Sequence, residues 1–180
     1  DSSVVVNVVY SDDHIIVIDK AAGVVVHPGA GNNEKTLVNG LLALFPEIAG
    51  VGEEHRPGIV HRLDIGTTGL LIVARTQEAY EELVAMMSLR EVKRHYTALV
   101  WGHPAAPIGT IDAPIGRDPR NPLCMAVVAS GKPARTNYEV LETMFEPDVA
   151  LVACELETGR THQIRVHLQA TGHSVVGDPQ

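Results

Sequence analysis

Short apolar runs separated by turn residues form the main pattern of this chain. Runs typical of β-strands cover residues 4–10, 15–19, 70–74, 137–141 and 149–157, and residues 93–100 are basic at their start and strand-like afterwards. Between residues 102 and 122, frequent prolines and glycines favour short edge strands and turns. The pattern therefore predicts a chain that begins with strands and has helices interspersed among them.

Three segments carry helical periodicity instead. The first covers residues 36–45, with Thr36 as its N-cap and an apolar side made of Leu37, Leu41, Leu44 and Phe45. The second follows Thr76, and its apolar residues recur at helical spacing at Tyr80, Leu83, Val84 and Met87. The third follows the turn at residues 159–161 and stops at Gly172, with one side formed by Ile164, Leu168 and Thr171.

This order of elements predicts the fold class. Hairpin-like spacings between strands favour an α+β fold, in which a mixed, mostly antiparallel sheet is flanked by helices, over a doubly wound parallel sheet. No glycine-rich phosphate loop follows a strand, so we expect no nucleotide cofactor. A length of 180 residues fits one domain.

Composition restricts the cellular compartment and the partners to be expected for this protein. No apolar run approaches the roughly 20 residues of a membrane span, and no leader pattern opens the chain, so we expect no membrane association. The two cysteines, Cys124 and Cys154, lack metal-type spacing and suit a reducing cytoplasm. The net charge of −8 argues weakly against a nucleic-acid partner, but basic residues gather near the candidate motifs.

One stretch, residues 56–75, combines a buried strand with candidate chemistry. A single carboxylate, Asp64, lies between His61-Arg62 and a turn that contains Gly66 and Gly69, just before the apolar run at 70–74. The strand would fix the acid in place, and the arginine would give it a cationic neighbour. On spacing alone, a surface Arg–Asp pair that caps a turn explains the same residues.

Three motifs together resemble the RluA-type family of RNA pseudouridine synthases. The first is His61-Arg62-Leu63-Asp64 followed by Thr67-Thr68-Gly69. The second is Tyr96 in a Lys/Arg-x-Tyr-x-Ala-Leu-Val context, and the third is the run from Gly159 to His167. The chain departs from the usual family pattern at Thr68, where serine is usual, and at Ala21, where proline is common.

The resemblance implies a pseudouridine synthase catalytic fold with an active-site cleft across the sheet. It assigns catalysis to Asp64, which would be paired with Arg165, and to Tyr96, which would lie over the uracil and remove the C5 proton. The expected RNA-binding side chains are His61, Arg62, Arg160 and His162. It also implies RNA, most often ribosomal RNA, as the partner of a monomeric cytoplasmic enzyme that needs neither cofactor nor metal.

Two other functions fit parts of the same sequence. A non-catalytic RNA-binding module of the same fold would share the motifs without turning over substrate. A metal-dependent hydrolase could use His61, Asp64 and His162, although His162 and His167 do not share a helix face well enough for a zinc pair. The resemblance also leads us to expect that residues 1–180 are a catalytic domain shortened at its C-terminus and without the RNA-binding domain that precedes it in many members.

Overall fold

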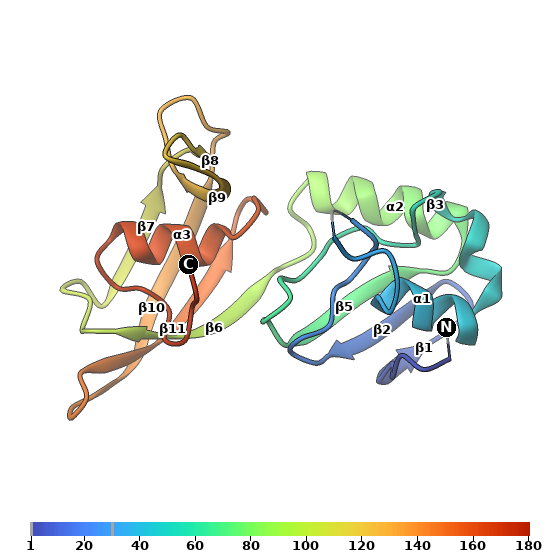
Figure 1. Cartoon of the computed structure of the whole chain (residues 1–180), viewed down its shortest axis with the longest axis horizontal. Helices are drawn as coiled ribbons and strands as arrows, with labels where there is room; N and C mark the ends of the chain where they lie inside the picture. Colours follow the sequence, from blue (N-terminus) through green and yellow to red (C-terminus); the bar gives the residue numbers. More distant parts are fainter. Residues whose placement is uncertain (1, 30) are drawn as a thin grey trace. The chain divides into compact units, whose positions relative to one another are not determined.

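The computed structural model describes residues 2–29 and 31–180, and these residues form two compact units. The first unit is Asp1–Val92, drawn from blue to green in Figure 1, and the second is Lys93–Gln180, drawn from green to red. The expected catalytic domain therefore consists of two compact units, each with its own sheet. No helix among the described residues is long and apolar enough to cross a membrane.

The first unit is built on a three-stranded antiparallel sheet with the order β1-β2-β5. Its strands are β1 (Val8–Ser11), β2 (Ile15–Lys20) and β5 (Gly69–Ala74). Ile16 pairs with Val73 and Ile18 with Leu71, and all four side chains are fully buried. The predicted strands at 15–19 and 70–74 are thus confirmed, and their alternating apolar residues form the core of this unit.

The first predicted strand was too long at its N-terminal end. Val4 and Val6 lie instead against Gly40 of helix α1 (Leu37–Leu44), close enough that a Cβ on Gly40 would be 2.7 Å from a methyl carbon of Val6. Because Gly40 has no side chain, the segment that contains Val4 and Val6 can lie directly against α1, so these valines pack against a helix rather than a strand. Val4 and Val6 are half-buried, whereas Val5 between them is exposed, so the run of valines predicted neither the extent of burial nor the partner.

Both helices of the first unit begin at the predicted caps. The Thr36 hydroxyl accepts a hydrogen bond from the Asn39 amide at the start of α1, and Thr76 does the same for Ala79 at the start of α2 (Gln77–Ser88). The predicted apolar sides are narrower than expected, since Leu44 and Val84 are exposed. The loop between α1 and β5 contains the short 3₁₀ helix η1 (Pro46–Gly50) and the two-residue strands β3 (Gly52–Glu53) and β4 (Arg56–Pro57).

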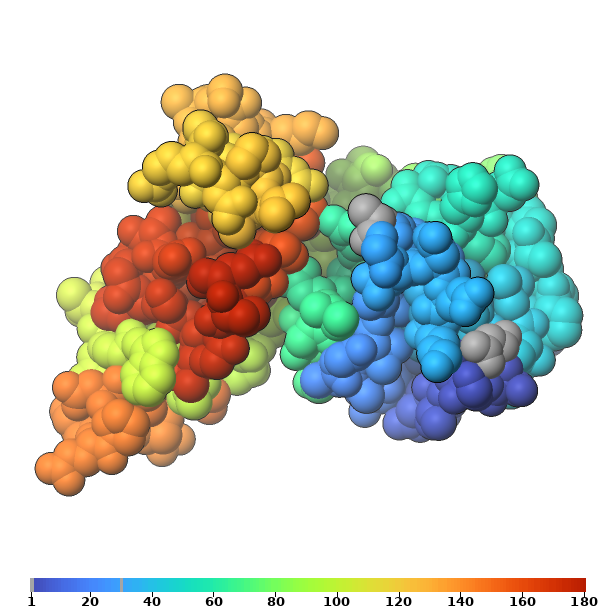
Figure 2. Space-filling model, in the orientation of Figure 1, coloured from blue at the N-terminus to red at the C-terminus, as the bar shows by residue number. Residues whose placement is uncertain are grey.

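The second unit is built on a four-stranded antiparallel sheet with the order β6-β11-β10-β7. These strands are β6 (His95–Trp101), β7 (Ile108–Asp112), β10 (Arg135–Met144) and β11 (Val149–Leu156). A separate ribbon pairs β8 (Ile115–Asp118) with β9 (Asn121–Val127). The β8–β9 ribbon and the tip of the β10–β11 hairpin protrude at opposite ends of this unit (Figure 2).

One face of this sheet is covered by α3 (Gln163–Ala170), the helix predicted to follow the turn at 159–161. Leu168 of α3 packs into a core with Val100, Val152 and Cys154, and Ile164 lies at its edge. The α+β fold class and the mostly antiparallel character of the strands are confirmed, and every strand pair among the described residues is antiparallel. The sheet that the sequence predicted as one body is divided between the two units.

Candidate active site

Asp64 occupies the first position of a β-turn that leads into β5. The Thr67 amide donates a 3.0 Å hydrogen bond to the Asp64 carbonyl, which closes the turn. Leu63 before it is buried, and Gly69 after it has a φ of +129°, which only glycine adopts without strain. The half-buried carboxylate therefore stands on a short, tightly bonded loop at the start of a core strand.

Lys20, at the end of β2, ties this turn to the rest of the first unit. Its side chain is 2% exposed, and its ammonium donates to the carbonyls of Ala21, Val24 and Ile65 at 2.9, 3.0 and 3.2 Å. The Ile65 carbonyl accepts a second bond from the Gly23 amide at 2.7 Å. Because Ile65 follows Asp64 directly, these bonds fix the backbone next to the candidate catalytic acid.

The Lys20 ammonium also supplies positive charge near Asp64. Burial lowers the pKa of Lys20, and the neighbouring Asp64 carboxylate works in the opposite direction by favouring the charged lysine. The lysine has three carbonyl acceptors and a nearby anion, the surroundings in which a buried ammonium is tolerated. This residue was missed in the sequence, where a lysine ending an apolar strand was the only signal.

His61 and Arg62, the two residues expected to bind substrate beside Asp64, have different surroundings. The Nε2 atom of His61 accepts a 3.0 Å bond from the Ile72 amide of β5, so its proton resides on Nδ1. That bond gives His61 a structural role at the edge of the strand. Arg62 is exposed, and its predicted contact with RNA stays a prediction.

Tyr96 lies on β6 in the second unit. It pairs with Cys154 of β11 and packs, half-buried, against the core that α3 covers. Side chains alternate along a strand, so Tyr96, Ala98 and Val100 face the same side as this core. The ring is thus fixed by the sheet.

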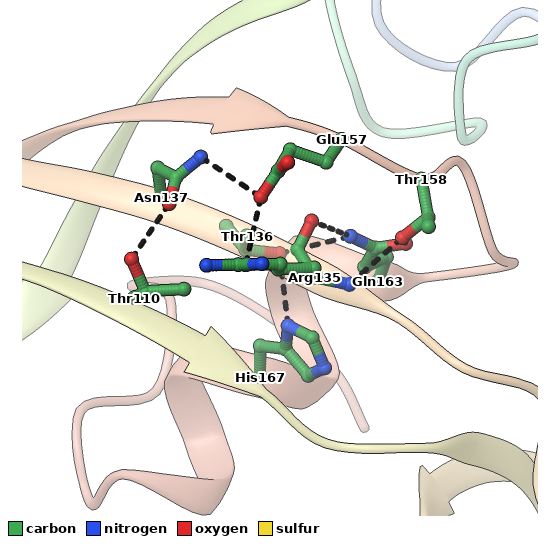
Figure 3. A network of polar contacts seen from close by, with 8 residues as sticks. All are labelled: Thr110, Arg135, Thr136, Asn137, Glu157, Thr158, Gln163 and His167. Carbon is green, nitrogen blue, oxygen red and sulfur yellow. Dashed lines mark hydrogen bonds and ion pairs between the residues drawn. The ribbon is translucent and has the colours of Figure 1, made fainter. Parts of the chain in front are cut away.

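Gln163, the first residue of α3, holds the loop that precedes the helix (Figure 3). Its carbonyl oxygen accepts from the Thr158 hydroxyl at 2.7 Å and the Arg160 amide at 3.0 Å. Its amide group donates to the Arg135 carbonyl and the Thr136 hydroxyl, at 3.0 and 2.9 Å. All four bonds of the buried amide are made, so the third motif is fixed to the start of β10.

His167, one turn further along α3, extends the same network (Figure 3). Its Nε2 lies 2.9 Å from the Ala113 carbonyl, which can only accept, so this nitrogen carries the proton. Its Nδ1, 2.8 Å from the Thr136 hydroxyl, then accepts the hydroxyl proton. The side chain is fully buried, and burial lowers the pKa of His167, so the ring is held neutral.

Arg165 is held by a carboxylate that the sequence did not single out. Its Nε and Nη2 atoms donate to the two oxygens of Asp178 at 2.8 and 2.7 Å, a bidentate pair. The hydrogen bonds from Arg165 hold the pKa of Asp178 below its ordinary value. The expected pairing of Arg165 with Asp64 stays a prediction.

Arg160 and His162, the two residues of the third motif expected to bind RNA, have structural surroundings as well. Arg160 donates from Nε to the Pro133 carbonyl at 2.9 Å. His162 precedes α3 with a φ of +55°, a left-handed conformation that costs a non-glycine residue of order 1 kcal/mol. Their predicted contact with RNA stays a prediction.

A family model described as RNA pseudouridylate synthase matches residues 14–170. The chain belongs to this family. The matched range contains the Asp64 turn, Tyr96 and Arg165, and it ends before Asp178.

Similar proteins have names that agree with the family. The "Ribosomal large subunit pseudouridine synthase D" of Nitrosomonas europaea is 55% identical over 172 residues, which are 96% of this chain and 48% of that protein. The protein of the same name in Pseudomonas aeruginosa is 53% identical over 96% of this chain and 52% of its own length. The chain thus spans about half the length of the curated relatives that it matches.

Solved structures agree with the fold. The structure of human RNA pseudouridylate synthase domain containing 1 superposes with a TM-score of 0.78 at 31% identity, covering 99% of this chain and 70% of that one. Human RNA pseudouridylate synthase domain containing 4 gives a TM-score of 0.73 at 27% identity, over 96% of this chain and 67% of that one. The likeness extends over both compact units.

Within this pseudouridylate synthase family member, the predicted catalytic residues are divided between the two units. Asp64 belongs to the first unit, whereas Tyr96 and Arg165 belong to the second. In the described part of the chain, no group of three or more His, Cys, Asp or Glu side chains is placed to hold a metal ion. The three residues that the resemblance assigns to catalysis carry a carboxylate, a phenol and a guanidinium.

Proposed function

We propose that this chain is the catalytic part of an enzyme that isomerises uridine to pseudouridine in structured RNA. The observation that carries the proposal is Asp64, a single carboxylate on a turn that Lys20 and Gly23 anchor, within the range of the family match. The names of the relatives support RNA of the large ribosomal subunit as the substrate. We further propose that the protein acts in the cytoplasm as a monomer.

The reaction needs few chemical groups because substrate and product are isomers. The N1–C1′ bond breaks, the uracil turns, C5 joins C1′, and the proton lost from C5 is balanced by one gained at N1. A single ionised carboxylate can either attack C1′ or assist elimination from the sugar, and both routes fit Asp64. Glycosidases use two carboxyl groups because a water must also be activated, and no water is consumed here.

The other motif residues would serve the same steps. Tyr96, fixed on β6, would cover the base and take the C5 proton through its hydroxyl. Arg165 would pair with Asp64 and keep it ionised, because a guanidinium stays charged and matches a carboxylate. The target base must leave its stack at a cost of a few kcal/mol, and Arg62, which is exposed, would contact the vacated position or a phosphate.

The substitution Asp64→Asn, made in the full-length protein, tests the proposal. The amide is nearly isosteric, so folding and RNA binding should persist, while pseudouridine formation in an unmodified large-subunit RNA transcript should stop. Nucleoside analysis of the product RNA measures the turnover. More than about a hundredth of the wild-type rate, equivalent to about 2.7 kcal/mol of barrier, would remove Asp64 from the mechanism.

Companion measurements separate the rival functions. Tyr96→Phe keeps the ring and loses the hydroxyl, so binding should hold while product fails to form. RNA binding without any turnover by the wild-type protein would identify a non-catalytic module. If the activity of the wild-type protein on RNA disappears with a strong chelator and returns with added metal, the metal-dependent hydrolase is favoured.

A further inference from the structure

We propose that Asp178 is a positioning residue, which holds the Arg165 guanidinium in the orientation that the isomerisation requires. The inference deepens the proposed function and rests on it, because it concerns the arginine of the same site. Asp178 lies outside the range of the family match, which ends at residue 170.

The first observation is the geometry of the pair. Asp178 binds Arg165 through two parallel bonds of 2.8 and 2.7 Å, and the two side chains are 9% and 20% exposed. A guanidinium is planar and rigid, so fixing Nε and Nη2 also fixes the direction of the third nitrogen, Nη1. A single bond, or a point charge such as a lysine ammonium, would leave that direction undefined.

The second observation is that the carboxylate is itself held. Gly177 has a φ of +80°, and the Asp178 amide donates to the Val175 carbonyl at 3.2 Å, so a tight turn presents the side chain. The Gln180 amide donates to the Asp178 carboxylate at 3.1 Å. The orientation of Arg165 is thus determined by backbone geometry as well as by charge.

The third observation is the strand on which this turn is anchored. The Trp101 amide donates to the Ser174 carbonyl at 2.9 Å, and the Val176 amide donates to the Leu99 carbonyl at 2.8 Å. Trp101 and Leu99 belong to β6, the strand that carries Tyr96. Asp178 therefore connects α3, through Arg165, to the strand of the second candidate catalytic residue.

The ion pair between Asp178 and Arg165 is maintained at neutral pH because both groups are charged there. The hydrogen bonds from Arg165 come first among the causes that lower the pKa of Asp178, and nearby His162 favours the ionised form as well. Both partners of the pair are thus charged under assay conditions. Bidentate pairs of this kind, largely removed from solvent, are stronger and better oriented than surface pairs.

Asp178→Asn tests the inference because the amide keeps the shape but cannot accept two charged bonds. We expect kcat for pseudouridine formation to fall by about tenfold or more, with KM for RNA within about twofold and the thermal midpoint within a few degrees. Asp178→Glu keeps the charge and should recover part of kcat. The matched control is Glu53→Gln, which removes a carboxylate from another bidentate pair, Glu53–Arg56, with bonds of 2.6 Å.

A double substitution shows whether Asp178 acts through Arg165. In an Arg165→Ala background, Asp178→Asn should add less than about a twofold further loss, because its partner is already gone. Equal fold-losses in the two backgrounds, or a wild-type kcat for Asp178→Asn, would overturn the inference. If Asp178→Asn does not fold, Asp178→Glu provides the test instead. A folded Asp178→Glu variant whose kcat is no higher than that of Arg165→Ala would also overturn the inference, because the restored carboxylate would then not orient Arg165.

The two proposals fail in different ways. If Asp64→Asn keeps its activity, the proposed function is wrong whatever Asp178 does. If Asp64→Asn is inactive and Arg165→Ala is slowed while Asp178→Asn is unimpaired, the function stands and only the positioning role is lost.

Discussion

Two charged residues, Lys20 and Asp178, support the candidate catalytic residues Asp64 and Arg165. Lys20 joins the strand β2 to the Asp64 turn through three carbonyls, and Asp178 joins the C-terminal turn to Arg165. Neither residue belongs to the three motifs that resemble the family. Buried charges are expensive unless fully paired, so each of them restricts its surroundings to one arrangement.

Lys20→Met should therefore lower both stability and activity. The methionine fits the volume of the lysine stem but leaves the carbonyls of Ala21, Val24 and Ile65 without this donor. We expect the free energy of unfolding to fall by about 2 kcal/mol or more in urea titrations, and turnover to fall because the Asp64 turn is released. Lys93→Met, at a side chain 68% exposed, is the control and should change stability by less than about 0.5 kcal/mol. Wild-type stability for Lys20→Met would contradict the role given to the buried ammonium.

At the scale of elements, α3 is fixed by polar contacts as much as by apolar ones. Gln163 and His167 are buried on the helix and bind the start of β10 through Thr136, while Leu168 packs into the core. The apolar pattern of the helix predicted where it lies in the sequence. The polar residues fix how α3 is rotated and how closely it packs on the sheet, because their hydrogen bonds need specific partners. This in turn fixes the position of Arg165.

His167 makes the stability of this element depend on pH. The pKa of the folded state is lowered by burial below the ordinary value of about 6.5, although nearby Asp112 works in the other direction. Below about pH 6.5 the unfolded chain therefore binds a proton that the folded chain excludes. The free energy of unfolding should fall as the pH decreases, by at most about 1.4 kcal/mol per pH unit for one proton.

The measurement compares urea unfolding between pH 7.5 and 5 for the wild type and His167→Gln. The glutamine cannot titrate, so its stability, lower at neutral pH, should depend less steeply on pH. His55→Gln, at an exposed position, is the control and should keep the wild-type slope. Parallel slopes for the wild type and His167→Gln would mean that another group causes the acid sensitivity.

At the scale of the whole molecule, charge is distributed unevenly. Of the −8 net charge, the second unit contributes only −1, with eight of the 14 Lys and Arg against nine of the 22 Asp and Glu. Within that unit the β8–β9 ribbon and the tip of the β10–β11 hairpin protrude at opposite ends (Figure 2). The ribbon carries the exposed Arg117 and Arg120, whereas the hairpin carries the exposed Glu142 and Glu146. The ribbon thus carries two arginines against one carboxylate, Asp118, which forms an ion pair with Arg120.

Neutralising the ribbon should weaken RNA binding. Arg117→Gln with Arg120→Gln removes two cations, and the Arg120 side chain is 90% exposed. We expect the Kd for a large-subunit RNA fragment to rise at least tenfold, about 1.4 kcal/mol, and the log–log salt slope to fall by about 2. The control, Glu142→Gln with Glu146→Gln, changes the net charge by the same amount in the other direction. If it tightens binding by a similar factor, net charge rather than the ribbon governs affinity.

The sequence alone determined the local features of this protein. Strands β2, β5, β6 and β11, the helix caps Thr36 and Thr76, and the stop at Gly172 follow from periodicity and capping chemistry, which depend on neighbours a few residues away. The three motifs are also local strings, so they predicted the family and the identity of the candidate catalytic residues.

Tertiary structure alone decided what those residues contact. The order β6-β11-β10-β7, the division into two units, and the pairing of Arg165 with Asp178 depend on which segments meet across the fold. Lys20 directly follows the predicted strand at 15–19 and was not singled out, yet its side chain is buried and three carbonyls from two separate loops converge on it. A hydrogen bond needs its partner at about 3 Å, and a one-dimensional pattern carries no such distance between residues far apart in the chain.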